Sequence, residues 1–469
     1  MGELNKNPQS QQSSSNVFFA ARQALRRHAS GGNVLIAATL LALIVANIPG
    51  INTFYNHLWT HEIRLQIGNF NLFSHAGHPM TLIQFINDAL MAVFFFSIGL
   101  EIKREVLVGE LSSVKQALLP IIGAIGGMAL PVGIFLLLSR GTDFTDGAAI
   151  PMATDIAFSL GILSMLGNRV PISLKIFLTT LAVVDDIGGI IVIAVFYSGH
   201  IEAMLLVYAL GLLGLLLLGS LLRIKSKLFY IGIGVGVWFL FLNSGIHPTI
   251  AGVLVAFCVP ATPVFAPKKY IKKIRKAINR FRAEDDETLN KRTILSHEQM
   301  DWLKQIESAS DKVISPLQDL EDTLHPIVNY LIIPLFAFAN AGIYFLDMNP
   351  ATIFEGVSLA VMAGLVLGKF GGIFIFSWLA VKLKLAPMPA RSNWKMVASI
   401  AMLGGIGFTV SLFIANLSFG SMGAHGQDLL DHSKLGIVIG SFLSGLLGYL
   451  FLRFTLPKHN AEDPSEENE

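Results

Sequence analysis

Long apolar segments alternate with short polar links along almost the whole chain. Most of them approach the roughly 20 residues that a helix needs to cross a bilayer, although 228–243 and 246–260 are shorter. The pattern predicts twelve membrane-spanning segments near 33–50, 82–108, 117–139, 147–166, 173–197, 203–222, 228–243, 246–260, 325–345, 352–381, 394–417 and 435–455. We therefore expect an all-α polytopic membrane protein.

The polar segments predict little structure of their own. They divide the chain into a disordered, basic N-terminus (1–30), spans one to eight (31–260), a charged insertion (261–324), spans nine to twelve (325–455) and an acidic tail (456–469). The insertion has too little apolar content for a folded domain. Its basic stretch 268–276 is expected to contact anionic lipid head groups rather than nucleic acid. The first apolar run is too long and too late for a cleavable signal peptide.

Lys and Arg residues gather on one side of the predicted membrane. All but four of the 34 fall on links that the alternation of spans assigns to the same face. Of those four, Lys369 lies inside a span, and Arg64, Arg140 and Lys434 lie on the opposite face. Positively charged links face the cytoplasm, so both termini are expected to be cytoplasmic.

The composition agrees with this class. Hydrophobic residues make up 53% of the 469 residues and charged residues 14%, whereas soluble domains carry about 25% charged residues. The net charge of +2 does not indicate a partner. Cys258 is the only cysteine, which excludes an internal disulfide or a cysteine-based metal site. We expect it to be a small buried apolar residue.

Two adjacent aspartates, Asp185 and Asp186, lie in the middle of the apolar run 176–196. An ionised Asp at the centre of a membrane helix costs about 2.5–3.5 kcal/mol, so a pair needs a compensating function. Carboxylate oxygens are hard donors that suit protons and small hard cations. The pair could instead cap a helix at a loop, but the apolar sequence on both sides argues against that. It therefore points to cation or proton handling within a membrane.

Two predicted spans carry helix-breaking residues. Pro151 and Asp155 interrupt 147–166, and three glycines, Gly404, Gly405 and Gly407, interrupt 394–417. Non-helical backbone at membrane depth is tolerated only where it is buried or lines a cavity, and paired breaks point to the binding site of a transporter. The glycines are also compatible with close packing of an intact helix.

Broken helices expose backbone dipoles that need compensating charge. Asp155 can supply negative charge and Lys369, in the middle of its span, positive charge. Simpler interpretations are that Asp155 only caps the second half-helix, and that Lys369 extends its amine to the membrane interface.

Several runs together resemble the NhaA-type bacterial sodium/proton antiporters. They are Ala153-Thr154-Asp155, Leu-Ala-Val-Val-Asp-Asp-Ile-Gly-Gly at 181–189, Leu-Phe-Ala-Phe-Ala-Asn-Ala-Gly at 335–342, Gly368-Lys369, and 85–105. The resemblance extends from about residue 30 to 455, apart from the insertion at 261–316. It implies twelve helices in two inverted repeats, with unwound fourth and eleventh helices that cross near the midplane.

The resemblance also implies a function and a site. It implies exchange of Na⁺, and also Li⁺, for protons across the bacterial inner membrane. The family members are expected to be homodimeric transporters, not enzymes, and to need no cofactor. By resemblance, Asp186 is the main cation ligand and proton carrier, and Asp185 is its partner in the site. Thr154 and Asp155 lie at the crossing, with Asp155 balancing the helix dipoles, and Lys369 pairs with Asp185. Asp88 matches a less directly involved acid.

Elementary physical chemistry suggests how such a pair could drive exchange. Desolvation and mutual repulsion raise the proton affinity of two adjacent buried carboxyl groups, which titrate as a coupled unit. A sodium ion can then neutralise the site only by displacing protons. If more protons than sodium ions move in each cycle, the membrane potential contributes about 2.3 kcal/mol per net charge for each 100 mV. The proton gradient would then drive sodium export, for Na⁺ and pH homeostasis.

A second polar cluster is expected at the cytoplasmic end of the second span. Glu101, Arg104 and Glu105 lie one turn apart, which favours either a salt-bridged surface or, by resemblance, a pH-responsive cluster joined by Glu321. The chain departs from the family here at Asp322, where a histidine is frequent, and in the adjoining insertion at 261–316.

Two further residues keep two interpretations each. His247 is either a pH sensor near the outer face or a solvated turn histidine. Asp88 is either part of the transport machinery or a satisfied polar residue between helices. The polar outer stretch 51–80 is a candidate for the contacts of a dimer.

Two other classes of protein need comparison. An intramembrane aspartyl protease takes its two aspartates from different helices and would leave Lys369 unexplained. A sodium-driven solute symporter is the closer alternative. It requires a pocket for an organic substrate, which the short links and the carboxylate-rich centre do not suggest.

Overall fold

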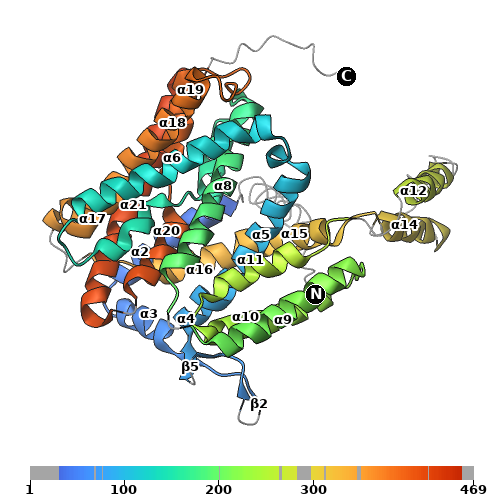
Figure 1. The fold of residues 1–469 in the computed structure, drawn as a ribbon, viewed down its shortest axis with the longest axis horizontal. Coiled ribbons are helices and arrows are strands. Elements are labelled where there is room, and N and C mark those ends of the chain that lie inside the picture. Colours follow the sequence, from blue (N-terminus) through green and yellow to red (C-terminus); the bar gives the residue numbers. More distant parts are fainter. Residues whose placement is uncertain are drawn as a thin grey trace, which may run out of the picture. The chain divides into compact units, whose positions relative to one another are not determined.

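The computed structural model describes residues 31–67, 70–75, 78–199, 201–262, 267–282, 297–310, 313–345, 350–420 and 422–456. Within these ranges the chain is mainly helical (Figure 1). The predictions for residues 1–30, and for the acidic tail beyond Leu456, lie outside the described residues.

Nine helices of the described chain are long and apolar enough to cross a membrane. The number rises to eleven if each of two bent pairs counts as one span. One pair is α2 (Gly31–Asn47) and α3 (Ile51–Thr60), which meet at 114°, and the other is α19 (Trp394–Leu403) and α20 (Phe408–Phe419), which meet at 44°. The segment predicted at 246–260 forms only α11 (Pro248–Cys258), because the helix begins at Pro248 and contains only 11 residues. The fold is that of an all-α polytopic membrane protein.

The chain forms two compact units. The first contains Met1–Thr60, Val114–Gly189 and Asn329–Glu469, and it includes both interrupted spans. Its further helices are α6 (Val114–Leu138), η3 (Thr145–Met152), α7 (Ile156–Met165), η4 (Gly167–Arg169), α8 (Ile172–Phe196, up to Gly189), α16 (Ile333–Asn340), η6 (Pro350–Phe354), α17 (Gly356–Ala363), η7 (Gly364–Lys369), α18 (Phe370–Lys382) and α21 (Gly423–Thr455). The π-helical turn η5 (Val328–Ile332) leads into α16.

The second unit contains His61–Ser113 and Ile190–Val328. Its helices are α4 (Leu82–Gln84), η1 (Phe85–Leu90), α5 (Met91–Val108), η2 (Glu110–Ser112), α9 (Ala203–Leu221), α10 (Lys227–Ser244), α11, α12 (Pro267–Arg282), α14 (His297–Ser310) and α15 (Pro316–Ile327). Its apolar core joins side chains of α5, α9, α10, α11 and α15, including Leu100, Trp238 and Leu320.

Short β-strands, which the hydrophobic pattern did not predict, follow α3 in the polar stretch after Thr60. β1 (Glu62–Ile63), β5 (His78–Thr81) and β4 (Ser74–His75) form an antiparallel sheet in the order β1-β5-β4. β2 (Gln66–Ile67) pairs with β3 (Phe70–Asn71) as a second antiparallel pair. Strands of two to four residues carry too little alternation to be recognised from the sequence.

The ninth predicted span begins earlier than its apolar run suggests. Ser315 accepts a hydrogen bond from the Gln318 backbone N–H, and Pro316 occupies the first turn, so α15 starts there rather than near 325. The helical segment then runs from Pro316 to Asn340 through η5. Part of the predicted insertion therefore belongs to this helix. The insertion also contains two helices, α12 and α14, which pack against each other.

In the first unit, α6 and α18 pack closely (Figure 1). A side chain on Gly372 would overlap the backbone of Gly126 and Gly127, so these helices approach at a distance that only glycine permits. A side chain on Gly368, in η7, would likewise overlap the backbone of Pro131. This packing fixes η7, which carries Lys369, against α6.

Candidate cation site

The first interruption ends a 3₁₀ turn and starts a helix at Asp155. Pro151 lies inside η3, and the chain then runs through Ala153 in an extended conformation before α7 begins. Asp155 is the N-cap of α7, and its Oδ1 atom accepts a hydrogen bond from the Phe158 N–H at 3.0 Å. Asp155 therefore caps the second half-helix, as one interpretation of the sequence predicted.

The second interruption separates α19 from α20 at residues 404–407. Glycine is required here by close approach. A side chain on Gly405 would overlap the backbone oxygen of Leu365, and one on Gly407 would overlap Ser411 and Leu365. The break thus packs directly against η7 and against the start of α20.

Hydrogen bonds connect the two breaks. Thr154 donates from Oγ1 to the Gly404 carbonyl at 2.9 Å, and the Asp155 N–H donates to the Ile406 carbonyl at 2.6 Å. Ser159 donates to the Leu403 carbonyl at 3.1 Å. These donors reach carbonyl groups at the C-terminal end of α19 and in the break that follows it, where regular helical partners run out. Leu403 O also accepts the Ile406 N–H at 3.1 Å.

Asp155 also reaches the start of α20. Its Oδ2 atom accepts hydrogen bonds from Thr409, at 3.2 Å from the backbone N and 2.7 Å from Oγ1. One carboxyl group, 3% exposed, thus lies at the N-termini of both α7 and α20. Helix N-termini carry partial positive charge, so this position favours the carboxylate.

The adjacent aspartates lie on α8 in the same unit. Asp185 and Asp186 are 2% and 6% exposed. Asp185 accepts a short hydrogen bond through Oδ2 from the ammonium group of Lys369, whose side chain is completely buried. Its other oxygen, Oδ1, has no hydrogen-bond partner among the described residues. Thr154, which donates a hydrogen bond to the second break, contributes to the electrostatic environment of Asp185, so the ion pair lies near the contact between the broken helices.

Lys369 ends a π-helical turn, η7. The structure has two other such turns in its described residues, and one of them, η1, carries Asp88. Single π-helical turns in α-helices often occur at functional sites. The buried ion pair itself is weak evidence for a stabilising role, because desolvation of both charges offsets much of their attraction.

The donor set suits a small hard cation. Two carboxyl groups, a threonine hydroxyl and the carbonyls of broken helices are hard oxygen ligands. The described residues contain no group of three or more His, Cys, Asp or Glu side chains that would hold a resident metal ion.

The predicted cytoplasmic cluster is assembled in the second unit. Arg104 contacts Glu105 at 3.0 Å and Glu321, on α15, at 2.9 Å. Glu101 interacts electrostatically with Glu321, Arg104 and Glu105. Glu105 also accepts the Glu110 N–H at 3.1 Å, next to the end of α5. The arrangement contains one cation among three acids.

His247 and Asp88 lie together, which the sequence did not predict. His247 Nε2 is 3.6 Å from Asp88 Oδ1, and its Nδ1 is 2.8 Å from the Thr249 hydroxyl. Trp238 donates to the Asp88 backbone carbonyl at 3.1 Å. Both side chains are partly buried, so neither is a freely solvated turn residue.

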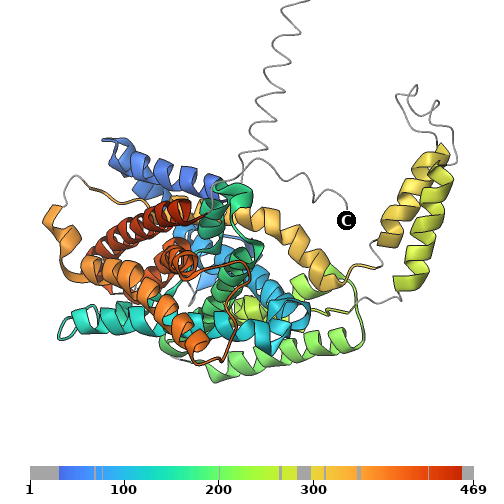
Figure 2. The ribbon, with the colours of Figure 1, turned by 90° about the horizontal axis from the view of Figure 1, so that it is seen from above.

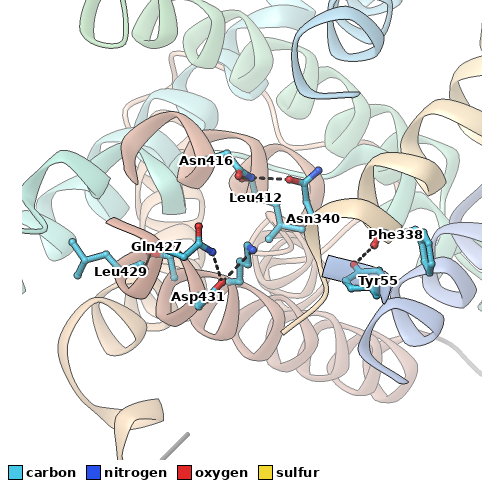
Figure 3. Close-up of polar contacts among 10 residues, drawn as sticks. Tyr55, Phe338, Asn340, Leu412, Asn416, Gln427, Leu429 and Asp431 are labelled. Carbon is cyan, nitrogen blue, oxygen red and sulfur yellow. Dashed lines mark hydrogen bonds and ion pairs between the residues drawn. The ribbon is translucent and has the colours of Figure 1, made fainter. Parts of the chain in front are cut away.

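Several polar contacts of the first unit were not predicted from the sequence, and one of them, from Thr409, supports the site. Thr409 is the second residue of α20, just beyond the glycine-rich break, and that position near a helix start could have identified it as a candidate. Asn416 on α20 donates to Asn340 Oδ1 at 3.0 Å (Figure 3). Asn340 belongs to the run 335–342, but nothing in the sequence indicated which residue it would meet. In the same view, Tyr55 donates to the Phe338 carbonyl at 2.5 Å, which ties α3 to α16.

The sequence matches the family described as Na⁺/H⁺ antiporter 1 over residues 22–452. The Na⁺/H⁺ antiporter NhaA of Phocaeicola vulgatus is 53% identical over 448 residues, which cover 96% of this chain and 98% of the relative. NhaA of Bacteroides fragilis is 53% identical over 426 residues, 91% of this chain and 95% of its own length. NhaA of Porphyromonas gingivalis is 46% identical over 429 residues, with 92% and 94% covered. The chain therefore belongs to the Na⁺/H⁺ antiporter family.

Proposed function

We propose that this protein exchanges Na⁺ for protons across a membrane, and that the exchange takes place at Asp185 and Asp186. The observation that carries the proposal is the buried Lys369–Asp185 pair beside Asp186 in the unit that holds both broken helices. Family membership supports the reaction. It also supports a transporter rather than an enzyme.

The residues divide the work as follows. Asp186 is the main cation ligand and proton carrier, and Asp185 shares the ion through Oδ1, which has no protein donor in the described chain. Thr154 supplies a hydroxyl oxygen at the same place. Na⁺ binding weakens the attraction between Lys369 and Asp185, because the cation competes with the ammonium group for one carboxylate.

Competition produces exchange. Sodium and protons neutralise the same carboxyl groups, so one leaves when the other binds. The empty charged site is costly to move through the membrane, whereas the loaded site is less so. Asp155 keeps the two half-helix N-termini compensated throughout, because it already accepts hydrogen bonds from both. The cycle requires no cofactor.

Further properties belong to the same proposal. Li⁺ replaces Na⁺ because it is also a small hard cation. More protons than sodium ions move per cycle, so the exchange is electrogenic and the proton gradient drives sodium export. The protein lies in the bacterial inner membrane with both termini in the cytoplasm, where most of its Lys and Arg residues fall. Its role is Na⁺ and pH homeostasis.

Control by pH and assembly complete the proposal. The Glu101, Arg104, Glu105 and Glu321 cluster responds to cytoplasmic pH, since protonation of one acid frees Arg104 for the others. His247 and Asp88 respond to pH together because they face each other.

A homodimer forms through the polar stretch 51–80, and the protein contacts membrane lipids. Crosslinking in native membranes that recovers only monomer would contradict the dimer.

Everted vesicles from a host without its own antiporters test the reaction. Respiration acidifies the vesicle interior, and a pH-sensitive dye follows the proton movement after Na⁺, Li⁺ or K⁺ is added. Alkalinisation by Na⁺ and Li⁺ supports the proposal. No response from inserted protein between pH 6.5 and 9 would contradict it, and sodium-dependent solute uptake by the same vesicles would favour a symporter.

A further inference from the structure

The inserted helix α12 is strongly basic. Eight of its 16 residues are Lys or Arg and none is Asp or Glu. They are Lys268, Lys269, Lys272, Lys273, Arg275, Lys276, Arg280 and Arg282. The positive charges of such a helix repel one another, so the helix is either surrounded by water or bound to a negatively charged partner.

One apolar stripe of α12 is already covered. Tyr270 and Ala277 are buried, and α12 packs along α14, where Trp302 and Ile306 are half-buried. The two helices lie side by side as a hairpin (Figure 2). Lys273 lies over the Tyr270 ring at 5.5 Å, so even the covered stripe is bordered by a cation.

A second set of apolar side chains is exposed. Ile271 is 50% and Ile278 43% exposed on α12, and Met300 is 42% and Leu303 40% exposed on α14. At 100° per residue, Ile271 and Ile278 lie roughly 90° from the stripe that faces α14. Leu303 lies at a similar angle from the α12-facing side of α14.

These four side chains share one side of the hairpin. On each helix, viewed from its own N-terminus, the two exposed residues lie in the same rotational direction from the side that contacts the other helix. Two helices that run in opposite directions bring such displacements to the same side. Arg275 and Lys272 border this side on α12, where apolar groups lie in the centre and basic groups at the edge. On α14 the exposed Glu307 lies on the same side, next to Leu303, so the positive charge of this side comes from α12.

We propose that this side of the hairpin, formed by Ile271, Ile278, Met300 and Leu303 and called here the hairpin face, docks on the anionic phospholipid surface of the protein's own membrane. Basic residues bordering exposed apolar side chains are the pattern of helices that lie in a bilayer interface. The chain's own acidic segments fit less well. Residues 284–287 and 457–469 contain no large apolar side chain that could cover the hairpin face.

The docking is independent of cation exchange, and it can be measured in the full-length protein. A fluorescent label is attached to a cysteine at one of two positions. Leu303→Cys lies on the hairpin face, and Gln305→Cys lies exposed on the opposite side of α14. Both are made with Cys258→Ala. The labelled proteins are reconstituted into phosphatidylcholine, with or without phosphatidylglycerol, and quenching by brominated acyl chains is recorded. Unchanged thermal unfolding establishes that both variants are folded.

We expect quenching at position 303 and not at 305, only when phosphatidylglycerol is present. Quenching should fall in 1 M salt, where the Debye length is about 3 Å. In Lys272→Gln, Arg275→Gln and Lys276→Gln, docking should weaken by roughly five-fold per charge. Equal quenching at both positions, none at either, or no dependence on phosphatidylglycerol would overturn the proposal. So would docking that appears only after residues 457–469 are removed, because the tail would then be the occupant.

Discussion

Among single residues, the most heavily buried charges belong to an ion pair whose two side chains have no exposure to solvent. Lys369 and Asp185 lose the hydration of both charges, and each is held in place by the other. Asp186 adds a second acid next to Asp185. Asp155 accepts hydrogen bonds at the N-termini of α7 and α20, where its negative charge compensates the helix dipoles. In the proposed cycle, protons or cations enter this site and neutralise it.

Removing one partner of the ion pair should cost more than removing both. Lys369→Ala leaves a buried carboxylate without its cation and should lower the free energy of unfolding by roughly 3–5 kcal/mol. In Lys369→Ala with Asp185→Asn the loss should be smaller, because neither charge remains unpaired. Thermal unfolding in detergent measures both. A double variant less stable than the single one would contradict the account, and Lys369→Arg is the control that keeps the charge.

Thr409 positions Asp155. Thr409→Val keeps the shape but removes the hydroxyl that donates to Oδ2 at 2.7 Å, at a cost of about 1–3 kcal/mol for the buried acceptor. We expect slower exchange with an altered pH profile. Thr409→Ser restores the donor and should restore the profile. If Val and Ser variants show the same profile as the unmodified protein, the hydroxyl plays no part in positioning Asp155.

At the scale of elements, the broken helices and the glycine-lined contact of α6 with α18 set the geometry. Much of this follows from the sequence. Pro151, Asp155 and the glycines at 404–407 indicated both breaks, and the apolar run around the adjacent aspartates indicated that both would be buried. The partners of those residues did not follow, because Thr409 meets Asp155 across 254 positions and Asn416 meets Asn340 across 76. A one-dimensional pattern carries no signal for such pairings.

Boundaries were predicted less well than the apolar runs. The start of α15 at Pro316 depends on the Ser315 cap, a local hydrogen bond that precedes the apolar run. The strands at 62–81 are too short to show a period. The pairing of His247 with Asp88 depends on the packing of the second unit, which the chain order does not reveal.

A side chain at the α6–α18 contact should separate the two helices. Gly372→Ala places a methyl group against the backbone of Gly126 and should cost about 1–3 kcal/mol in unfolding free energy, together with slower exchange. Gly133 on α6 offers the matched control, since nothing lies within 4 Å of the position that its side chain would occupy. Gly133→Ala should be neutral or stabilise the helix by up to about 1 kcal/mol. Equal effects of the two substitutions would mean that this contact is not tight.

At the scale of the whole molecule, nine to eleven described helices can cross a membrane, and the basic residues indicate their direction. Both interrupted spans and the aspartate pair belong to one compact unit, whereas the Arg104 cluster belongs to the other. The proposed pH control and the proposed cation site are therefore carried by different parts of the chain.

The orientation can be tested with reporter fusions. Alkaline phosphatase fused after Leu456 should be inactive, because the C-terminus is predicted to be cytoplasmic. The same enzyme fused after Gly141, next to Arg140 on the opposite face, should be active. Fusions of a fluorescent protein that folds only in the cytoplasm should give the reverse result. An active phosphatase at Leu456 would reverse the predicted orientation.

In the proposed exchange, Na⁺ and protons compete for Asp185 and Asp186. Purified protein in a weakly buffered solution should release protons when Na⁺ is added, which a pH-sensitive dye detects directly. Asp186→Asn should abolish the release, whereas Asp301→Asn, an exposed position on α14, should leave it unchanged. Proton release from Asp186→Asn equal to that of the unmodified protein, or Na⁺ binding without any release, would contradict the claim.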